Sequence, residues 1–265
     1  MSNEISSKLY ISTLADDAAV LAREHGFGLE IVEFCTALNF DTGFSAWDAA
    51  VREKMKGVES FTFHAPFNEL CPAAIDPLIL DVTRKRFAQA FNLMTGYGIN
   101  TMIAHSGFIP NVYFEEWFVE KSVTFWWDYL SDKPEGFRLY LENVLESSPD
   151  SLIEVAAAIN DERFRLCLDI GHAAILEPRM PILEWVERML PFLGHIHLHN
   201  NYGKRDTHNA LGDGDIDVAE VIRMVTKKAP GATFTLETSS AETSVSWLRT
   251  NGFGTFYPII RSARG

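Results

Sequence analysis

Short runs rich in β-branched, leucine and aromatic residues alternate along the chain with longer runs of helical periodicity. The runs that we predict as strands are 8–12, 29–34, 61–64, 101–106, 137–143, 165–170, 195–200 and 233–238. The runs that we predict as helices are 16–25, 46–56, 78–97, 113–130, 152–159, 183–190, 218–227 and 241–251. Strands that alternate with helices imply a parallel sheet. Eight such units in 265 residues predict an α/β fold, a closed (β/α)8 TIM barrel, as a single domain over residues 1–265.

Composition limits the classes of function. The net charge of −13 argues against a general nucleic-acid binder, which usually presents a basic face. The first residues lack a basic segment followed by an apolar run, so we expect no signal peptide, and no apolar run is long enough to cross a membrane. The three cysteines, Cys35, Cys71 and Cys167, show no CxxC spacing. We therefore expect reduced thiols and a cytoplasmic protein.

The stretch 194–214, GHIHLHNNYGKRDTHNALGDG, concentrates imidazoles. His195, His197 and His199 alternate along a predicted strand, and alternate strand residues share one face. Asp206 and His208 follow in a polar loop. Few structural roles require this pattern, whereas a metal site requires it directly, so the stretch predicts metal ligands.

The predicted strand ends carry the same chemistry. In (β/α)8 barrels the active site lies at the carboxyl ends of the strands. Acidic or imidazole side chains lie in or directly after six successive predicted strands: His64, His105, Glu142, Asp169, His197 and Glu237. Converging carboxylates repel one another unless cations neutralise them. Mixed nitrogen and oxygen ligands favour Zn²⁺, Mn²⁺ or Fe²⁺ over Ca²⁺ or Mg²⁺.

The motifs HAPF, HSG, LEN, LDIGHA, the HxH strand with DTHNALGDGDI, and LET resemble those of the xylose isomerase-like TIM-barrel superfamily. This superfamily includes endonuclease IV and many sugar isomerases and epimerases, and the resemblance covers essentially the whole chain. The endonuclease IV type implies three zinc ions held by nine ligands. Carried over to this sequence, those ligands are His64, His105, Glu142, Asp169, His172, His197, Asp206, His208 and Glu237.

Two enzymatic functions follow from this resemblance. The first is a phosphoester (phosphodiester) hydrolase with two or three metal ions, Zn²⁺ first, acting on a small phosphorylated or nucleotide-like metabolite. Its catalytic residues would be Glu142, Glu237 and His172, and Lys204 and Arg205 would bind phosphate oxygens.

The alternative is a sugar or sugar-phosphate isomerase or epimerase with a single metal ion. It would need only Glu142, Asp169, His197 and Glu237, with the two glutamates as acid and base. Phe67, Trp47 or Trp117 would then stack on a sugar ring, and His172 would contact the substrate. This chemistry does not need four of the nine implied ligands, which are His64, His105, Asp206 and His208. Because they are present, the hydrolase is our first expectation.

Cleavage of DNA at abasic sites is disfavoured. The loops 35–47 and 65–77 would have to enter the duplex, and Phe67 could act there as a wedge. Neither loop contains the Arg or Lys that binding of the phosphate backbone needs.

The expected partner is a small-molecule substrate. We expect neither DNA nor a membrane as partner, and we leave open whether the protein forms a homodimer. A non-catalytic binding barrel has no positive support. His195 is expected in a deeper layer, and whether Glu33, Asn143, His195 and His199 support the ligands stays open.

Overall fold

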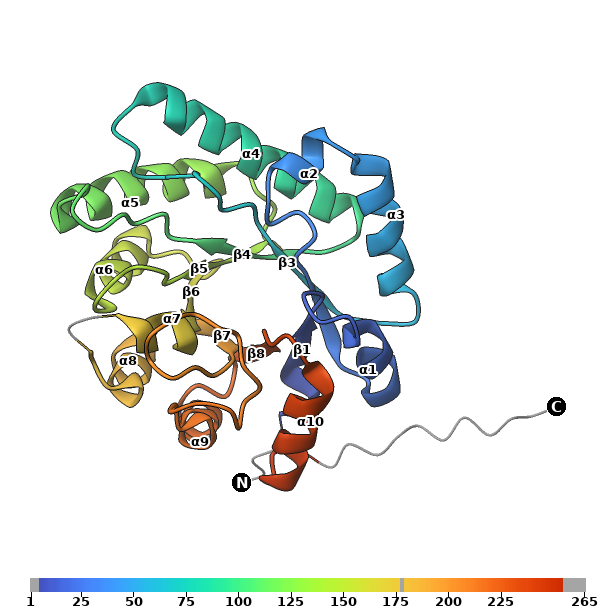
Figure 1. Ribbon diagram of the computed structural model, residues 1–265. Helices are drawn as coiled ribbons and strands as arrows, with labels where there is room; N and C mark the ends of the chain where they lie inside the picture. Colours follow the sequence, from blue (N-terminus) through green and yellow to red (C-terminus); the bar gives the residue numbers. More distant parts are fainter. Residues whose placement is uncertain (1–4, 177–178, 255–265) are drawn as a thin grey trace.

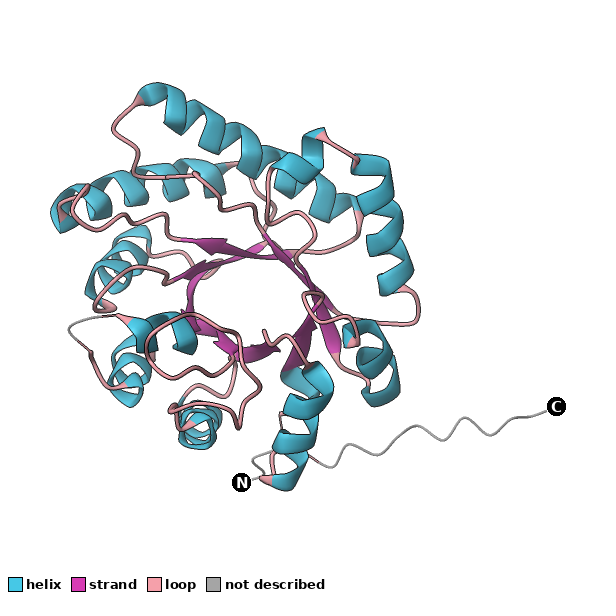
Figure 2. Ribbon diagram, viewed as in Figure 1, coloured by secondary structure: helices cyan, strands magenta, loops and turns pink. Residues whose placement is uncertain are grey.

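The structure, a computed structural model, describes residues 5–176 and 179–254. Within these residues eight parallel strands close into a barrel in chain order, and β1 pairs with β8. The strands are β1 (Leu9–Ser12), β2 (Gly28–Ile31), β3 (Phe61–His64), β4 (Thr101–His105), β5 (Arg138–Glu142), β6 (Phe164–Asp169), β7 (Leu193–Leu198) and β8 (Thr233–Leu236). Figure 2 shows this ring of strands enclosed by helices. The predicted (β/α)8 TIM barrel is thereby confirmed.

The helices surround the barrel (Figure 1). They are α1 (Ala18–His25), α2 (Leu38–Asp41), α3 (Phe44–Met55), α4 (Pro77–Gly96), α5 (Glu115–Ser131), α6 (Asp150–Ile159), α7 (Ile170–Ile175), α8 (Ile182–Met189), α9 (Val218–Lys228) and α10 (Ala241–Thr250), with a 3-10 turn η1 (Ser6–Lys8) before β1. Two short helices, α2 and α7, lie where we predicted no helix, and α7 begins at Ile170, which we predicted as the end of a strand. The ends of the predicted single domain, 1–4 and 255–265, lie outside the described residues.

Aromatic side chains pack the layer between the barrel and its outer helices. Trp126 of α5 is fully buried, and its ring centroid lies 5.1 Å from that of Phe87 on α4. Phe164 of β6 lies 6.3 Å from Trp126 on the barrel side. Such pairs bury large apolar areas in defined geometry. They join α4 and α5 to the barrel at the start of β6.

The strand register sets the level of the polar side chains. His105 pairs with Glu142, and Asp169 pairs with His197 across the next strands. Glu142 in turn pairs with Cys167, two residues before Asp169. Because the strands are parallel, their carboxyl ends meet at one rim. The acidic and imidazole groups predicted at the strand ends therefore gather at one mouth of the barrel.

The remaining expectations on thiols and membrane segments can also be compared with the structure. Cys35, Cys71 and Cys167 are all free, as their odd number and spacing predict. Among the described residues, no helix combines the length and the apolar character needed to cross a bilayer.

Candidate metal centre

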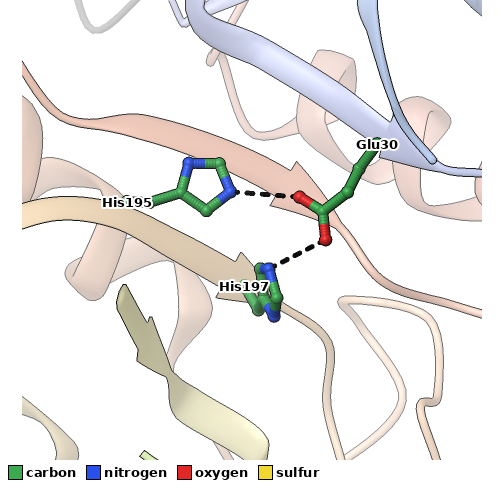
Figure 3. A group of neighbouring side chains, drawn as sticks. All are labelled: Glu30, His195 and His197. Carbon is green, nitrogen blue, oxygen red and sulfur yellow. Dashed lines mark ion pairs between the residues drawn. The ribbon is translucent and has the colours of Figure 1, made fainter. Parts of the chain in front are cut away.

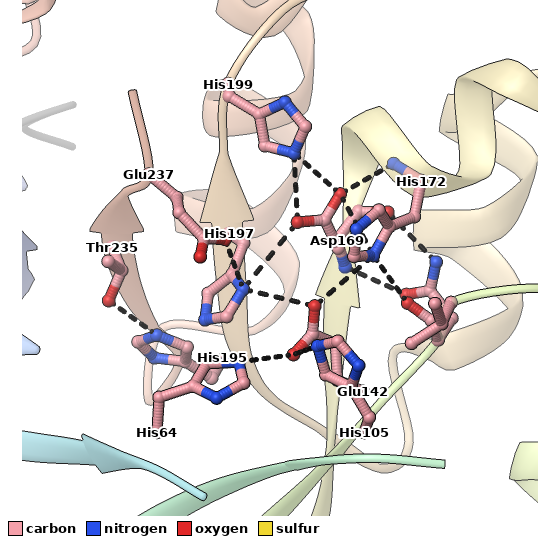
Figure 4. A network of polar contacts seen from close by, with 12 residues as sticks. His64, His105, Glu142, Asp169, His172, His195, His197, His199, Thr235 and Glu237 are labelled. Atoms are coloured by element: carbon pink, nitrogen blue, oxygen red, sulfur yellow. Dashed lines mark hydrogen bonds and ion pairs between the residues drawn. The ribbon is translucent and has the colours of Figure 1, made fainter. Parts of the chain in front are cut away.

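Four side chains from successive strands form a central group at the mouth of the barrel. They are Glu142 at the end of β5, Asp169 at the end of β6, His197 in β7 and Glu237 directly after β8. His197 Nδ1 faces all three carboxylates, at 2.9 Å from Glu237, 3.3 Å from Glu142 and 3.6 Å from Asp169 (Figure 4). One imidazole nitrogen and three carboxylates thus converge on one small volume.

A first flanking group lies on the side of β3 and β4. The Nε2 atoms of His64 and His105 lie 3.3 and 3.5 Å from the same Glu142 oxygen. Phe67, from the loop after β3, stacks on the His105 ring with centroids 4.1 Å apart and planes inclined by 14°. Phe67 and His105 also line a cavity of about 150 Å³ together with apolar side chains that include Leu70 and Phe108.

A second flanking group lies on the side of α7 and the loop that follows β7. His172 Nε2 and His208 Nε2 lie 3.2 and 2.9 Å from the same Asp206 oxygen. His172 Nδ1 lies 3.3 Å from Glu142, which joins this group to the central one. The structure therefore brings together all nine residues that the resemblance implied as ligands.

The other predicted contact residues lie differently. Lys204 and Arg205 are exposed in the loop after β7, although Asp206 next to them enters the site. Trp117 lies on α5, where its indole N–H donates to the carbonyl of Ala73. Trp47 lies on α3 and is 40% exposed. Of the predicted aromatic contacts, Phe67 is the one that touches an imidazole of the site.

Three imidazoles share one orientation. The Nδ1–H groups of His64, His172 and His208 each donate to a backbone carbonyl, at 2.9, 3.0 and 2.8 Å. A carbonyl oxygen only accepts hydrogen bonds, so Nδ1 carries a proton in each ring. The Nε2 atom of each ring is left to face a carboxylate. Metal-binding histidines need this arrangement. The hydrogen bond of Nδ1 fixes the orientation of the ring, and Nε2 then points toward the place that a metal ion would occupy.

The buried carboxylates are held ionised by the imidazoles. Burial alone would raise the pKa of Glu142, but His197 and His172, among the surrounding imidazoles, hold that pKa well below its usual range. Burial would likewise raise the pKa of Asp169, but His172 and His199 hold it well below its usual range. The site therefore presents negative charge at neutral pH.

The carboxylates in turn shift the pKa values of the imidazoles. Burial lowers the pKa of His172, but Asp169 and Asp206 raise it well above its usual range. The pKa of His208 is raised to about 9, because Asp206 outweighs burial there. His105 differs, since burial, the largest cause, lowers its pKa to about 3. Without a metal ion, protons on His172 and His208 offset the carboxylate charge.

The buried polar atoms of the site fit divalent cations. Among the described residues, both oxygens of Glu142 and Oδ1 of Asp206 are buried without a hydrogen-bond partner. Orphaned buried oxygens are costly unless something else coordinates them. The ligand atoms of His64, His105 and Glu142 lie within 4.8 Å of one another, as do those of His172, Asp206 and His208. This mixture of nitrogen and oxygen donors suits Zn²⁺, Mn²⁺ or Fe²⁺.

The sequence left the supporting role of four residues open, and three of them are His199, Asn143 and Glu33. His199 Nε2 donates to both oxygens of Asp169, at 2.9 and 3.0 Å. The Asn143 side chain brackets the Asp169 backbone, accepting from its N–H at 2.8 Å and donating to its carbonyl at 3.0 Å. Glu33 instead pairs with Lys54 at 2.7 Å and accepts from Thr13. Of these three residues, His199 and Asn143 therefore touch a predicted ligand directly.

One residue of this surrounding layer was missed. Glu30 is fully buried in β2 beneath the central group. His195, predicted in a deeper layer, lies there too, and its ring nitrogens contact Thr233 and Thr235. The available signal for Glu30 was a carboxylate within the otherwise apolar stretch LEIV, residues 29–32.

The comparisons with known proteins agree with this architecture. A family model described as the xylose isomerase-like TIM barrel matches residues 19–251. The chain belongs to this family, as its motifs predicted. Among curated proteins it is 27% identical over 170 residues to the uncharacterised protein MJ1311 of Methanocaldococcus jannaschii. That match covers 60% of this chain and 57% of the relative, which is less than two thirds of its length.

Solved structures share the fold. A D-tagatose 3-epimerase-like protein superimposes with a TM-score of 0.74 at 21% identity, over 92% of this chain and 96% of the other. The TTHB071 protein of Thermus thermophilus, soaked with ZnCl2, gives 0.72 at 22% identity over 92% and 97% of the two chains. D-psicose 3-epimerase of Clostridium cellulolyticum, with D-tagatose, gives 0.65 at 16% identity over 86% and 83%.

Proposed function

We propose that the protein is a metal-dependent isomerase or epimerase that moves a proton at the carbon next to the carbonyl of a sugar or sugar phosphate. The central group carries this proposal, because Glu142 and Glu237 approach the same nitrogen of His197 from different strands. The names of the epimerases that share the fold support it. None of these three structure names supports the phosphoester hydrolase that was our first expectation from the number of ligands.

The two glutamates supply the acid and the base. One carboxylate takes the proton from the carbon, and the electron pair of the C–H bond moves into an enediolate of the substrate. The other glutamate enters the turnover protonated and gives that proton to the opposite face, so the two carboxyl groups exchange their protonation states. A metal ion, when bound, polarises the carbonyl and stabilises the negative oxygen. Ligands of such an ion would be Glu142, Asp169, His197 and Glu237.

The imidazoles around the central group bind the substrate in this proposal. His64, His105, His172 and His208 point polar nitrogens toward the mouth, which suits a ligand with several hydroxyl groups. The face of Phe67, stacked on His105, offers an apolar surface for the carbon skeleton. His64 and His172 are buried, so water reaches the reacting carbon poorly.

Solvent exchange tests the proposal. The metal-loaded protein is incubated with a panel of ketopentoses and ketohexoses in D2O, and deuterium at the carbon next to the carbonyl is measured by NMR. We expect exchange, and a loss of about 10²–10⁴-fold in both Glu142→Gln and Glu237→Gln. Glu187→Gln is the matched control, since Glu187 is an exposed carboxylate paired with Lys228 on the outer surface. Equal exchange in wild type and both site variants would contradict the roles of the two glutamates.

A polynuclear phosphoester hydrolase is the second candidate, because of one observation. Both flanking groups bring three ligand atoms together, beyond what a single-metal site needs. Elemental analysis of the metal-replete protein separates the two functions: we expect one tightly held ion per chain. Two or three ions, together with hydrolysis of a generic phosphodiester that His105→Ala abolishes, would favour the hydrolase instead.

A further inference from the structure

Glu30 has no access to solvent. Its carboxylate faces both His195 and His197, the imidazole of the central group (Figure 3). A carboxylate buried in a barrel is costly unless partners compensate it. Its oxygen Oε2 accepts hydrogen bonds from the hydroxyls of Thr62 and Thr235, at 3.1 and 2.7 Å, and lies 3.5 Å from His195 Nε2. These contacts fix the plane of the carboxylate from three strands.

The second oxygen of Glu30 faces His197. Oε1 lies 3.1 Å from Nε2 of that imidazole, on the side opposite the central group. Neither atom has another hydrogen-bond partner among the described residues, and this ion pair is the contact that joins them. On its other side, the ring turns Nδ1 toward Glu142, Asp169 and Glu237.

His197 is therefore oriented the other way round from His64, His172 and His208. Those rings anchor Nδ1 on backbone carbonyls and present Nε2, whereas His197 presents Nδ1. Its anchor must hold Nε2, and the group that Nε2 faces is a charged side chain instead of a carbonyl. A carboxylate behind a metal-binding imidazole fixes its tautomer and raises its basicity more than a carbonyl does.

We propose that Glu30 is a positioning residue that takes the Nε2–H of His197 as a hydrogen-bond donor, so that the Nδ1 lone pair is aimed at the metal ion of the central group. Glu30 touches neither the substrate nor the ion in this proposal, and it acts through His197 alone. The inference rests on the metal site of the proposed function but not on the reaction, so it is tested without substrate.

Metal affinity is the first measurement. Zn²⁺ is titrated into the metal-free protein against a chromophoric chelator, for wild type and Glu30→Gln. Gln has the size of Glu and lacks the charge, and we expect the affinity to fall about 10–100-fold. Glu146→Gln is the matched control, since Glu146 is also a buried carboxylate but accepts from the backbone of Val144 and Leu145 outside the site. Equal affinity in a folded Glu30→Gln protein and in wild type would overturn the inference.

A double-mutant cycle separates positioning from general damage. If Glu30 acts through His197, then Glu30→Gln lowers Zn²⁺ affinity in wild type but not further in a His197→Ala background. The control Glu146→Gln should have the same effect in both backgrounds. Independent losses for Glu30→Gln and His197→Ala, multiplying in the double variant, would show that Glu30 does not act through this ring.

NMR of the Zn²⁺-loaded wild type tests the tautomer and needs no folded variant. We expect a slowly exchanging, strongly downfield proton on Nε2 of His197 and a metal-shifted ¹⁵N resonance for Nδ1. A proton on Nδ1, or zinc on Nε2, would overturn the proposal. A wild type that binds no Zn²⁺ would instead overturn the proposed function itself, so the two failures are distinguishable.

Discussion

The carboxylate of Asp169 both caps a helix and faces the candidate metal centre. It ends β6 and caps α7, because its Oδ1 accepts the backbone N–H of His172 at 2.7 Å. The same carboxylate accepts from His199 and faces His197 Nδ1. The cap fixes the direction in which α7 leaves the strand, and this direction brings the His172 ring to Asp206. Local backbone chemistry thus places two of the predicted ligands.

We predict that the stability of the protein depends on pH through Glu146, which is not one of the predicted ligands. Burial raises its pKa above the ordinary value of 4.5, although hydrogen bonds from Ser106 and the backbone oppose this. The native state therefore keeps a proton that the unfolded state loses as the pH rises past 4.5. The stability that this protonation contributes is fully present below that pH and is lost as the pH rises through the native pKa.

Glu146→Gln should remove this loss, because a neutral amide resembles the protonated acid and its oxygen can still accept from Val144 and Leu145. Urea unfolding at several pH values measures it. We expect the free energy of unfolding of wild type, relative to the variant, to fall with pH by up to about 1.4 kcal/mol per unit within this window. Parallel curves for the two proteins would contradict the raised pKa.

The gathering of the nine candidate ligands at one mouth of the barrel could be predicted from the sequence, whereas Glu30 could not, for a physical reason. His64, His105 and Asp169 end strands, and strand ends can be located from local patterns. Glu30 lies inside a strand, and its partners His195 and His197 are far along the chain. Only the closed barrel, in which β2 lies across from β7, makes the contact visible.

At the scale of elements, α7 was missed because it has only six residues and begins directly after β6. Such a helix is too short to show a periodic pattern, and the sequence identifies its cap, Asp169, only as a ligand. The longer elements differ from prediction by a few residues. The 20-residue α4, for example, begins at Pro77, after the cap Asp76, whose side chain accepts from Leu78 N–H.

We predict a steric clash from a substitution in the first turn of α7. A Cβ at Gly171 would lie 1.8 Å from the His199 ring, so Gly171→Ala must displace the imidazole that donates to Asp169. We expect a loss of about 1–3 kcal/mol in the free energy of unfolding, which is usual for overpacking, and weaker Zn²⁺ binding.

Gly96→Ala is the control for this prediction. Gly96 ends α4, and a Cβ there meets nothing within 4 Å, so alanine should be neutral or stabilise by less than about 1 kcal/mol. Urea unfolding compares the variants. Wild-type stability in Gly171→Ala would show that the α7 backbone adjusts without moving His199.

At the scale of the whole molecule, the charge distribution predicts that a metal ion bound at the proposed centre stabilises the fold. The chain has a net charge of −13, and the mouth of the barrel gathers the buried carboxylates of Glu142 and Asp169 and the partly buried Glu237 around His197. Chelation should therefore lower the melting temperature. An ion at 100 times its dissociation constant stabilises by about 2.7 kcal/mol, which corresponds to roughly 5–10 °C for a chain of this size.

Thermal unfolding with and without a chelator measures this shift, and added Zn²⁺ should restore the higher melting temperature. The variant Glu142→Gln, which weakens the centre shared by all three groups, should show a smaller shift. An unchanged melting temperature, in a protein shown by elemental analysis to have lost its metal, would indicate that protons on the imidazoles compensate the carboxylates fully.

The closure of β8 between β7 and β1 also sets an order of events during synthesis. The central group draws on strands from β5 onward, and its last member, Glu237, directly follows β8. A nascent chain therefore holds no complete centre until its final strand has left the ribosome and paired on both sides. Uptake of an ion by the proposed centre would then be a late step of maturation, and its presence would mark a finished barrel.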